Sequence, residues 1–283
     1  MNLRAEIDAL SHVDMHYFNE RLTSELANRV ISPGDTVLDL GANVGYHTDN
    51  FSRLVGPGGR VHAFEPNPQL WPHLQRWRNV RVWPVAVGAE LGIATLHVPV
   101  GDNLDQVASL IDTTMFGPTS PHTVPVVAVD LLPEIDTVSF VKIDVERYEL
   151  QALNGMKALI ERCAPVIVYE GNTLEIEAFL TTLGYTAHQL AGDLHPKDRC
   201  PVANWIACPP GRAAQVTLGP EFVANLIEEI TRPAAPPAAV VAEPVVEPVL
   251  EKPLAETVAA SPAAAEPVPR SWLSRLLSPA SSG

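Results

Sequence analysis

The order of apolar and polar residues predicts a body in which short strands alternate with helices. Five short apolar runs predict strands, and the first of them shows no alternation, as in a parallel strand that is covered on both faces. They are 36–40, 60–64, 80–87, 139–143 and 165–169. Apolar residues at helical spacing predict helices over 46–55, from Pro68 onwards and over 174–183. This alternation indicates an α/β fold with a doubly wound, mostly parallel sheet.

Local signals define the first helices more closely. Apolar spacing over 3–30 predicts an N-terminal helix with a break near Ser11 and His12. Asn67 is a candidate N-cap, because Pro68 follows it at the position where a helix tolerates proline best. We therefore expect the helix after the second strand to begin at Pro68.

The remaining segments predict additions to the parallel sheet. The run 80–87 contains a proline, which favours an edge strand. Residues 93–98 predict an extra antiparallel strand, and 185–190 with 203–208 predict a terminal pair of strands. Residues 99–124 are polar and rich in turn residues, so we expect a loop that serves as a lid or substrate segment.

Composition divides the chain into four parts. We expect an N-terminal helical segment over 1–32, the main domain over 33–211 and a short helical extension over 212–231. The tail over 232–283 holds 10 of the 27 prolines, too many for a helix, and predicts a disordered linker. A short apolar motif, SWLSRLL at 271–277, interrupts it and is either a helical docking motif for a protein partner or low-complexity sequence.

Charge narrows the kind of partner. The net charge is −14, and almost all of it lies before the tail, so we expect no nucleic-acid binding and a preference for a cationic ligand. No apolar run is long enough for a signal peptide or a transmembrane segment, so we expect a cytoplasmic protein. The three cysteines lack the spacing of a disulfide framework or a zinc site and read as isolated thiols: Cys163, Cys200 and Cys208.

Candidate chemistry lies directly after the predicted strands, because ligands bind at the carboxyl ends of parallel strands. The first such loop carries Gly41 and Gly45, which allow a sharp turn, and Asn43, which tolerates positive φ better than other non-glycine residues. Glu65 ends the second strand, 24 residues after Gly41, near the offset of an acid that binds a ribose. Loop and acid together predict a nucleoside site.

The acids around this loop decide between cofactors. Asp39 precedes the loop, and Asp144 and Glu146 follow a neighbouring strand. Carboxylates gathered in this way repel a pyrophosphate, and they attract the sulfonium and ammonium groups of S-adenosyl-L-methionine. The pattern therefore favours that cofactor over a nicotinamide dinucleotide.

Several ordered blocks resemble the FkbM-type methyltransferases. They are DTVLDLGANVGYHT (35–48), GRVHAFEPNP (59–68), PVAVG (84–88), VASL (107–110), VPVVAVDLL (124–132), FVKIDVERYELQALNGM (140–156), PVIVYEGN (165–172) and NWIACP (204–209). The resemblance covers roughly 35–210 and is most specific in the FVKIDVE block. It implies a class I, Rossmann-like methyltransferase, usually an O-methyltransferase, that acts on glycans, other saccharides or secondary metabolites.

The resemblance also implies roles for single residues. Those that would hold the methionine part of the cofactor are Asp39, Gly41, Asn43 and Gly45. Glu65 would hold the ribose, Ala86 would lie by the adenine, and Asp144 would face the site of methyl transfer. The family usually has glycine after the D-V-E acids, but this chain has Arg147. That cation would narrow the site, pair with a neighbouring glutamate or contact an acidic substrate.

A hydroxyl acceptor is a weak nucleophile, so a base should remove its proton. The candidates are Asp144, Glu146 and Glu170, all at strand ends, with His47 and His195 as reserves. No compact spacing of ligands predicts a metal site. Two alternatives stay open: a nicotinamide-dependent oxidoreductase, and a non-catalytic scaffold that displays the motif at 271–277.

Overall fold

The computed structural model describes residues 3–100, 108–112, 117–171, 173–189, 204–212, 216 and 218–232. Residues 1–232 form one compact unit. The predictions for His195 and for the tail with its motif at 271–277 fall outside the described residues. Among the described helices, none is long and apolar enough to cross a bilayer.

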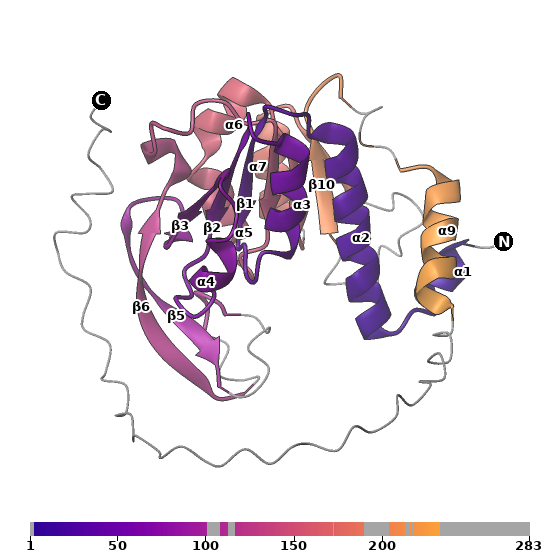
Figure 1. Ribbon diagram of the computed structural model, residues 1–283, viewed down its shortest axis with the longest axis horizontal. Helices are drawn as coiled ribbons and strands as arrows, with labels where there is room; N and C mark the ends of the chain where they lie inside the picture. The colour runs from indigo at the N-terminus through magenta and orange to yellow at the C-terminus, as the bar shows by residue number, and fades with distance from the viewer. Residues whose placement is uncertain are drawn as a thin grey trace, which may run out of the picture. The chain divides into compact units, whose positions relative to one another are not determined.

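A seven-stranded, mostly parallel sheet forms the centre of this unit (Figure 1). In spatial order its strands are β3 (Val80–Trp83), β2 (Arg60–Phe64), β1 (Thr36–Leu40), β7 (Phe140–Ile143), β8 (Val166–Glu170), β10 (Asn204–Cys208) and β9 (Thr186–Gln189). The first five are parallel, and β10 runs antiparallel to both of its neighbours. From β1 the chain moves outward through β2 to β3, and from β7 it moves in the other direction to β8, which confirms the doubly wound fold. Its switch point lies between β1 and β7, where such sheets bind ligands.

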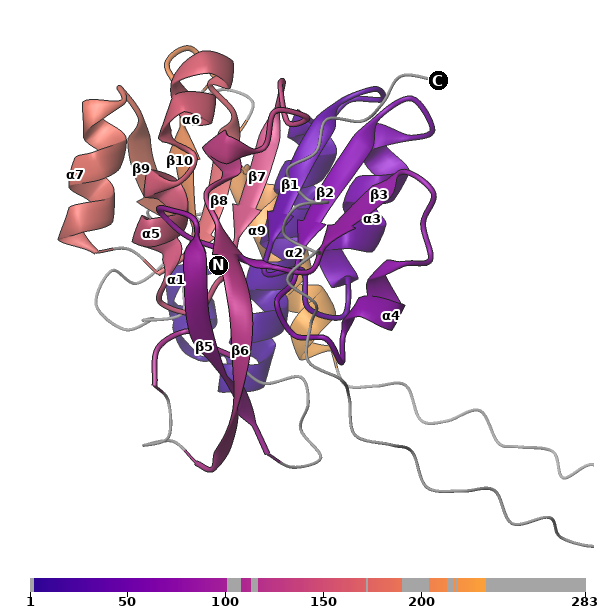
Figure 2. The same cartoon turned by 90° about the vertical axis from the view of Figure 1, so that its left-hand side faces the viewer.

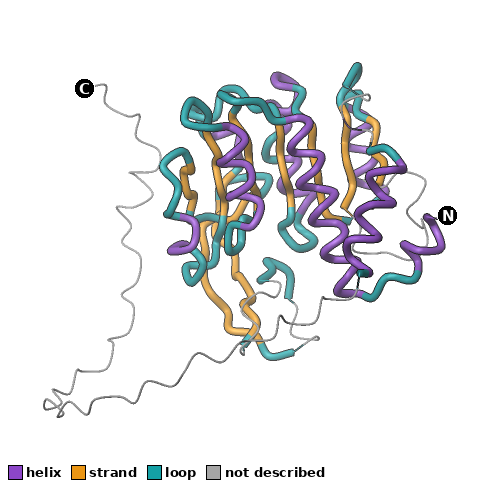
Figure 3. Tube along the Cα trace, turned by 45° about the vertical axis from the view of Figure 1, so that its right-hand side comes forward, coloured by secondary structure: helices purple, strands orange, loops and turns teal. Residues whose placement is uncertain are grey.

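Helices pack around the sheet, and Figure 3 shows some of them in front of the strands. They are α1 (Leu3–Asp8), α2 (His12–Val30), α3 (Tyr46–Val55), α4 (Trp71–Leu74), α5 (Glu149–Asn154), α6 (Lys157–Cys163), α7 (Leu174–Thr182) and α9 (Pro220–Thr231). The predicted break near Ser11 is confirmed, because the Asp14 backbone N–H donates to Ser11 Oγ and caps α2.

One apolar core joins the N-terminal helices and α9 to the sheet. Phe18, Leu22 and Leu26 of α2 are fully buried, in the same cluster as Phe140 of β7 and Val223 of α9. Full burial of one such side chain contributes about 1.5–3 kcal/mol relative to leaving it exposed. Helix α2 is therefore held firmly against the domain whose site it helps to build.

A second, three-stranded sheet has the order β4-β6-β5 and consists of β4 (Ala86–Val87), β6 (Thr119–Val127) and β5 (Gly92–Pro99). Figure 2 shows its β5–β6 hairpin extending past one end of the large sheet. The predicted antiparallel strand at 93–98 is confirmed as β5, which pairs with β6. The loop expected over 99–124 is wrong from Thr119 onwards, because alternating burial in β6 packs Val124 and Val126 against β5.

Two other expectations were wrong for local reasons. The strand expected over 80–87 is divided at Pro84 into β3, an edge strand of the large sheet, and β4 of the small one. Proline lacks the N–H that would continue the ladder. Asn67 does not cap a helix: its side chain accepts from the Gln69 backbone N–H in a local turn. Helix α4 begins only at Trp71.

Candidate functional site

The carboxyl ends of β1, β2, β7 and β8 open into one cavity of about 930 Å³. Predicted site residues that line it are Gly41, Asn43, Glu65, Ala86, Asp144, Glu146 and Glu170. Residues from the β5–β6 hairpin and from 108–110 form an apolar wall, and residues of α2 form a polar one. Two predicted site residues, Asp39 and Gly45, do not line this cavity. Asp39 is fully buried beneath the loop, and Gly45 is the N-cap of α3.

The glycine loop needs the conformations that its residues allow. Gly41 has φ 78°, and a Cβ there would overlap the backbone oxygen of Asp144. Asn43 has φ 49°, which confirms the expected left-handed residue, and Gly45 has φ 90°. The close approach of β1 and β7 therefore requires glycine at position 41.

Glu65 is fixed at the end of β2 by two backbone donors. The Asn43 N–H donates to Oε2 and the Asn67 N–H donates to Oε1, both at 2.8 Å. The residue is 5 % exposed. Burial raises its pKa to about 7, although the two backbone hydrogen bonds act in the opposite direction. Each oxygen has a second lone pair and can accept a ligand hydroxyl as well.

Three carboxylates meet at the ends of β7 and β8. Ligand oxygens of Asp144, Glu146 and Glu170 lie within 4.8 Å of one another. Lys142 Nζ donates to Asp144 Oδ2 at 2.9 Å. The Asp144 side chain is 33 % exposed, and it is the cavity that exposes it. The fold thus brings together three carboxylates as closely as the ligands of a metal ion, next to a lysine ammonium. No spacing in the sequence predicted this cluster.

Burial and mutual repulsion separate the pKa values of these acids. Burial disfavours ionised Asp144, but the Lys142 ammonium and a hydrogen bond from Glu170 outweigh it and lower the pKa of Asp144. Burial and the Asp144 charge raise the pKa of Glu170 well above its usual range. The same two causes raise the pKa of Glu146 to about 7. Asp144 is therefore an anion, Glu170 stays protonated and donates a hydrogen bond to Asp144, and Glu146 titrates near neutral pH.

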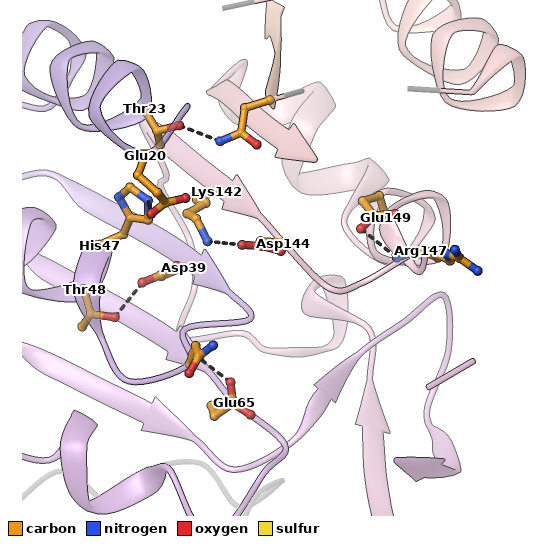
Figure 4. A network of polar contacts seen from close by, with 12 residues as sticks. Glu20, Thr23, Asp39, His47, Thr48, Glu65, Lys142, Asp144, Arg147 and Glu149 are labelled. Carbon is orange, nitrogen blue, oxygen red and sulfur yellow. Dashed lines mark hydrogen bonds and ion pairs between the residues drawn. The ribbon is translucent and has the colours of Figure 1, made fainter. Parts of the chain in front are cut away.

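The turn after β7 is strained. Glu146 has φ 52° and Arg147 has φ 72°, and residues other than glycine rarely adopt such backbone angles. Ser109 Oγ donates to the Glu146 carbonyl, and the Arg147 N–H donates to Glu149 Oε1. Figure 4 shows the Arg147 side chain directed away from Asp144, and it does not line the described cavity. The cation therefore leaves the site open.

Among the cavity-lining residues that sequence reasoning missed are Glu20, Lys142 and Asn204. Lys142 had a signal, since a lysine inside a buried strand is rare. Glu20 and Asn204 had none, because α2 and β10 reach the site only through the tertiary fold. Asn204 Nδ2 donates to Thr23 Oγ1 at 2.9 Å and joins β10 to α2.

The donor and acceptor atoms of the site suit a cationic nucleoside. The buried Asp39 Oδ1 and Asn43 Oδ1 have no hydrogen-bond partner within the described part of the chain. These are acceptors, as are the carboxylates around them, and a pyrophosphate would need donors instead. A ligand with hydroxyl donors and positive charge fits this site. It would find the open backbone at Gly41, the Glu65 carboxylate held by two N–H groups, and more acceptors than donors.

Comparison with known proteins gives a family for this arrangement. The domain family described as methyltransferase FkbM domain matches residues 39–187. A protein-L-isoaspartate O-methyltransferase of Aeropyrum pernix is 53% identical over 38 residues, 13% of this chain and 15% of the relative, so the match spans a small part of that protein.

Solved structures that are similar to the chain include two methyltransferase-fold proteins of low sequence identity. A methyltransferase FkbM from Methylobacillus flagellatus is 17% identical, with a TM-score of 0.39, over 73% of this chain and 58% of its own. A fibrillarin of Aeropyrum pernix, solved with natively bound S-adenosyl-L-methionine, is 16% identical, with a TM-score of 0.39, over 67% of this chain and 76% of its own.

Proposed function

This chain belongs to the FkbM methyltransferase family, and we propose that it transfers a methyl group from S-adenosyl-L-methionine to a hydroxyl oxygen of a saccharide or glycan. One observation carries the proposal. Glu65, a buried acceptor for hydroxyl groups, and the anion Asp144 line the same cavity on either side of the glycine loop of β1. A ligand that combines a nucleoside with a positive charge can bind Glu65 through its ribose and Asp144 through its charge.

The residues divide the cofactor between them. Glu65 accepts the ribose hydroxyls, and Ala86 in its apolar wall borders the adenine. Gly41, Asn43 and Gly45 hold the methionine part, with Asp39 acting through its charge from beneath the loop. When bound, the cofactor supplies a methyl group activated by a positive sulfur. Asp144 stabilises that charge at short range, and Lys142 keeps Asp144 ionised.

Glu146 removes the acceptor proton. Of the three candidate acids, Glu170 already carries a proton and Asp144 is a weak base beside Lys142. Glu146 titrates at about 7, where a general base is most effective. The proton of the acceptor hydroxyl passes to the Glu146 carboxylate as the oxygen forms the new bond to the methyl carbon. The bond from that carbon to the cofactor sulfur breaks at the same time, which leaves S-adenosylhomocysteine. Glu170 and Asp144 position the acceptor by hydrogen bonds.

The rim of the cavity supports a saccharide acceptor. Tyr17 of α2 and Tyr46 of α3 line it and stay 42% and 51% exposed. An exposed tyrosine offers an apolar ring face together with a polar tip, which matches the mixed surface of a sugar ring. His16 lines the same wall and adds a polar group that sugar hydroxyls can use.

Calorimetry tests the cofactor. The full chain should bind S-adenosyl-L-methionine and S-adenosylhomocysteine and leave NAD unbound, since carboxylates repel a pyrophosphate. Binding of NAD alone would instead favour the oxidoreductase alternative.

Transfer of tritiated methyl groups tests the acceptor. Label should enter a glycan or oligosaccharide extract and resist removal by mild base, as an ether does and an ester does not. Label that enters only protein carboxyl groups would contradict a hydroxyl acceptor. Cofactor binding without any transfer would favour the scaffold alternative.

A further inference from the structure

We propose that Glu20 of α2, together with His47 of α3, binds the amino-acid end of the cofactor, with the Glu20 carboxylate accepting from its ammonium group. This inference rests on the proposed function, because it concerns the same cofactor. It assigns a binding role to a residue outside the stretch 39–187 that matches the family. The matched domain would then depend on α2 to complete its site.

The fold holds Glu20 at the cavity. Its Oε2 lies 2.7 Å from His47 Nε2, and both residues line the cavity wall. On either side along α2, Phe18 and Leu22 are fully buried in the core, and Thr23 accepts from Asn204 of β10. Glu20 therefore reaches the site from a rigid helix and not from a mobile segment.

The pair lies where the part of the ligand remote from the ribose must be. Glu65 marks the ribose at the end of β2, and the loop from Gly41 leads from β1 directly into α3, which carries His47. Figure 4 shows Glu65 and the Glu20–His47 pair on different sides of Asp39. A ligand anchored at Glu65 that follows the loop thus ends beside α3 and α2.

Charge and hydrogen bonding suit an α-amino acid at this place. Burial disfavours the charged form of Glu20, but the His47 imidazole at 2.7 Å and the charge of Lys142 outweigh it, so the pKa of Glu20 is lowered and the residue is an anion. His47 is 4% exposed, and its Nδ1 has no hydrogen-bond partner within the described residues. Gly45 caps α3 without a side chain, which leaves the positive end of that helix for the ligand carboxylate.

The rival explanation is structural: the pair would only tie α2 to α3. A two-by-two comparison separates the two explanations. The full chain and its Glu20→Gln variant are titrated by calorimetry with S-adenosylhomocysteine and with S-adenosyl-4-thiobutyrate, which keeps the carboxylate and lacks the amino group. A structural role affects both ligands equally, whereas a binding role affects only the ligand with the ammonium.

We expect the unchanged protein to bind the desamino ligand about 10- to 100-fold more weakly than S-adenosylhomocysteine, as for the loss of a charge-assisted hydrogen bond. In Glu20→Gln that preference should fall to about twofold or less. Glu25→Gln is the matched control, since Glu25 lies on the same helix, pairs with Arg29 and does not line the cavity. Its preference should equal that of the unchanged protein.

Three results would overturn the inference. One is equal affinity of the unchanged protein for both ligands, which needs no folded variant. The others are a preference that survives in Glu20→Gln and an equal loss for both ligands in that variant. In each of these cases the unchanged protein still binds S-adenosylhomocysteine, so the proposed function stands. Failure of the unchanged protein to bind any of these nucleosides would end the proposed function itself.

Discussion

Single residues at the cavity carry backbone strain that marks the site. Asn43, Glu146 and Arg147 all have positive φ, and all lie in the loops that follow β1 and β7. Strain of this kind persists only where the surrounding structure fixes it, and it gathers at functional sites. Asn43 could be predicted from its chemistry. The residue types of Glu146 and Arg147 did not predict it, because neither favours a left-handed conformation; only the glycine usual in the family at position 147 pointed to it.

Arg147→Gly should stabilise the protein. Glycine relieves roughly 1–2 kcal/mol of left-handed strain and gives back about 0.5–1 kcal/mol through the entropy of the unfolded chain. We expect the free energy of unfolding to rise by about 0.5–1 kcal/mol in urea titrations. Arg147→Ala removes the side chain and keeps the Cβ, so it should give no gain. Equal effects of the two substitutions would show that φ is not the cause.

Glu146→Gln should abolish the rise of the methyl-transfer rate with pH, which is the acidic limb of the pH profile. A base with a pKa of about 7 must be deprotonated to act, so kcat/KM of the unchanged protein should rise with pH and level off above about 7. The variant should lose about 100-fold or more in kcat and show no such rise. Glu149→Gln, also buried beside the turn, is the control and should keep the limb. A limb that persists in Glu146→Gln would move the role of base to another acid.

Among the elements, two of the errors made from sequence lie at turns. Apolar runs gave β1, β2 and α3 with the observed bounds, because periodicity reports burial directly. The Asn67 side chain forms a local turn in place of a helix cap, and Pro84 ends β3 because it has no backbone N–H to donate. Both effects depend on where the next backbone groups lie, which periodicity does not report.

Gly41→Ala should disrupt the crossing of the β1 and β7 ends. The new Cβ would overlap the Asp144 backbone and strain a residue with φ 78°. We expect a loss of about 1–3 kcal/mol in unfolding free energy and cofactor affinity below detection by calorimetry. Gly58→Ala is the matched control, since nothing lies within 4 Å of its added Cβ. It should change stability by less than about 0.5 kcal/mol and leave binding intact.

Buried carboxylates at the site make the stability of the whole molecule depend on pH. Burial raises the pKa of Glu65, Glu146 and Glu149 to about 7, from an ordinary value of 4.5. Between these values the three acids bind more protons in the folded protein than in the unfolded chain, so their contribution to stability falls as pH rises through that window. Glu20 and Asp144 have lowered pKa values, and protonating them costs stability only at lower pH.

The protein without ligand should therefore be most stable near pH 5. We expect the midpoint of urea unfolding to decrease from pH 5 to pH 7.5. The double variant Glu146→Gln, Glu149→Gln should show a shallower decrease, since two of the groups responsible are gone. A midpoint that is flat or rises over this range would contradict the burial of ionisable acids at the site.

The sequence by itself determined the alternation of strands and helices, the loop that permits positive φ at Asn43 and the acids at the strand ends. These follow from the chemistry of each residue and of its near neighbours along the chain. Only the tertiary structure decided that Lys142 pairs with Asp144, that three carboxylates meet within 4.8 Å and that Glu20 reaches His47 from α2. Such contacts depend on which elements pack together, and the pKa of each acid depends on the neighbours and the burial that this packing imposes.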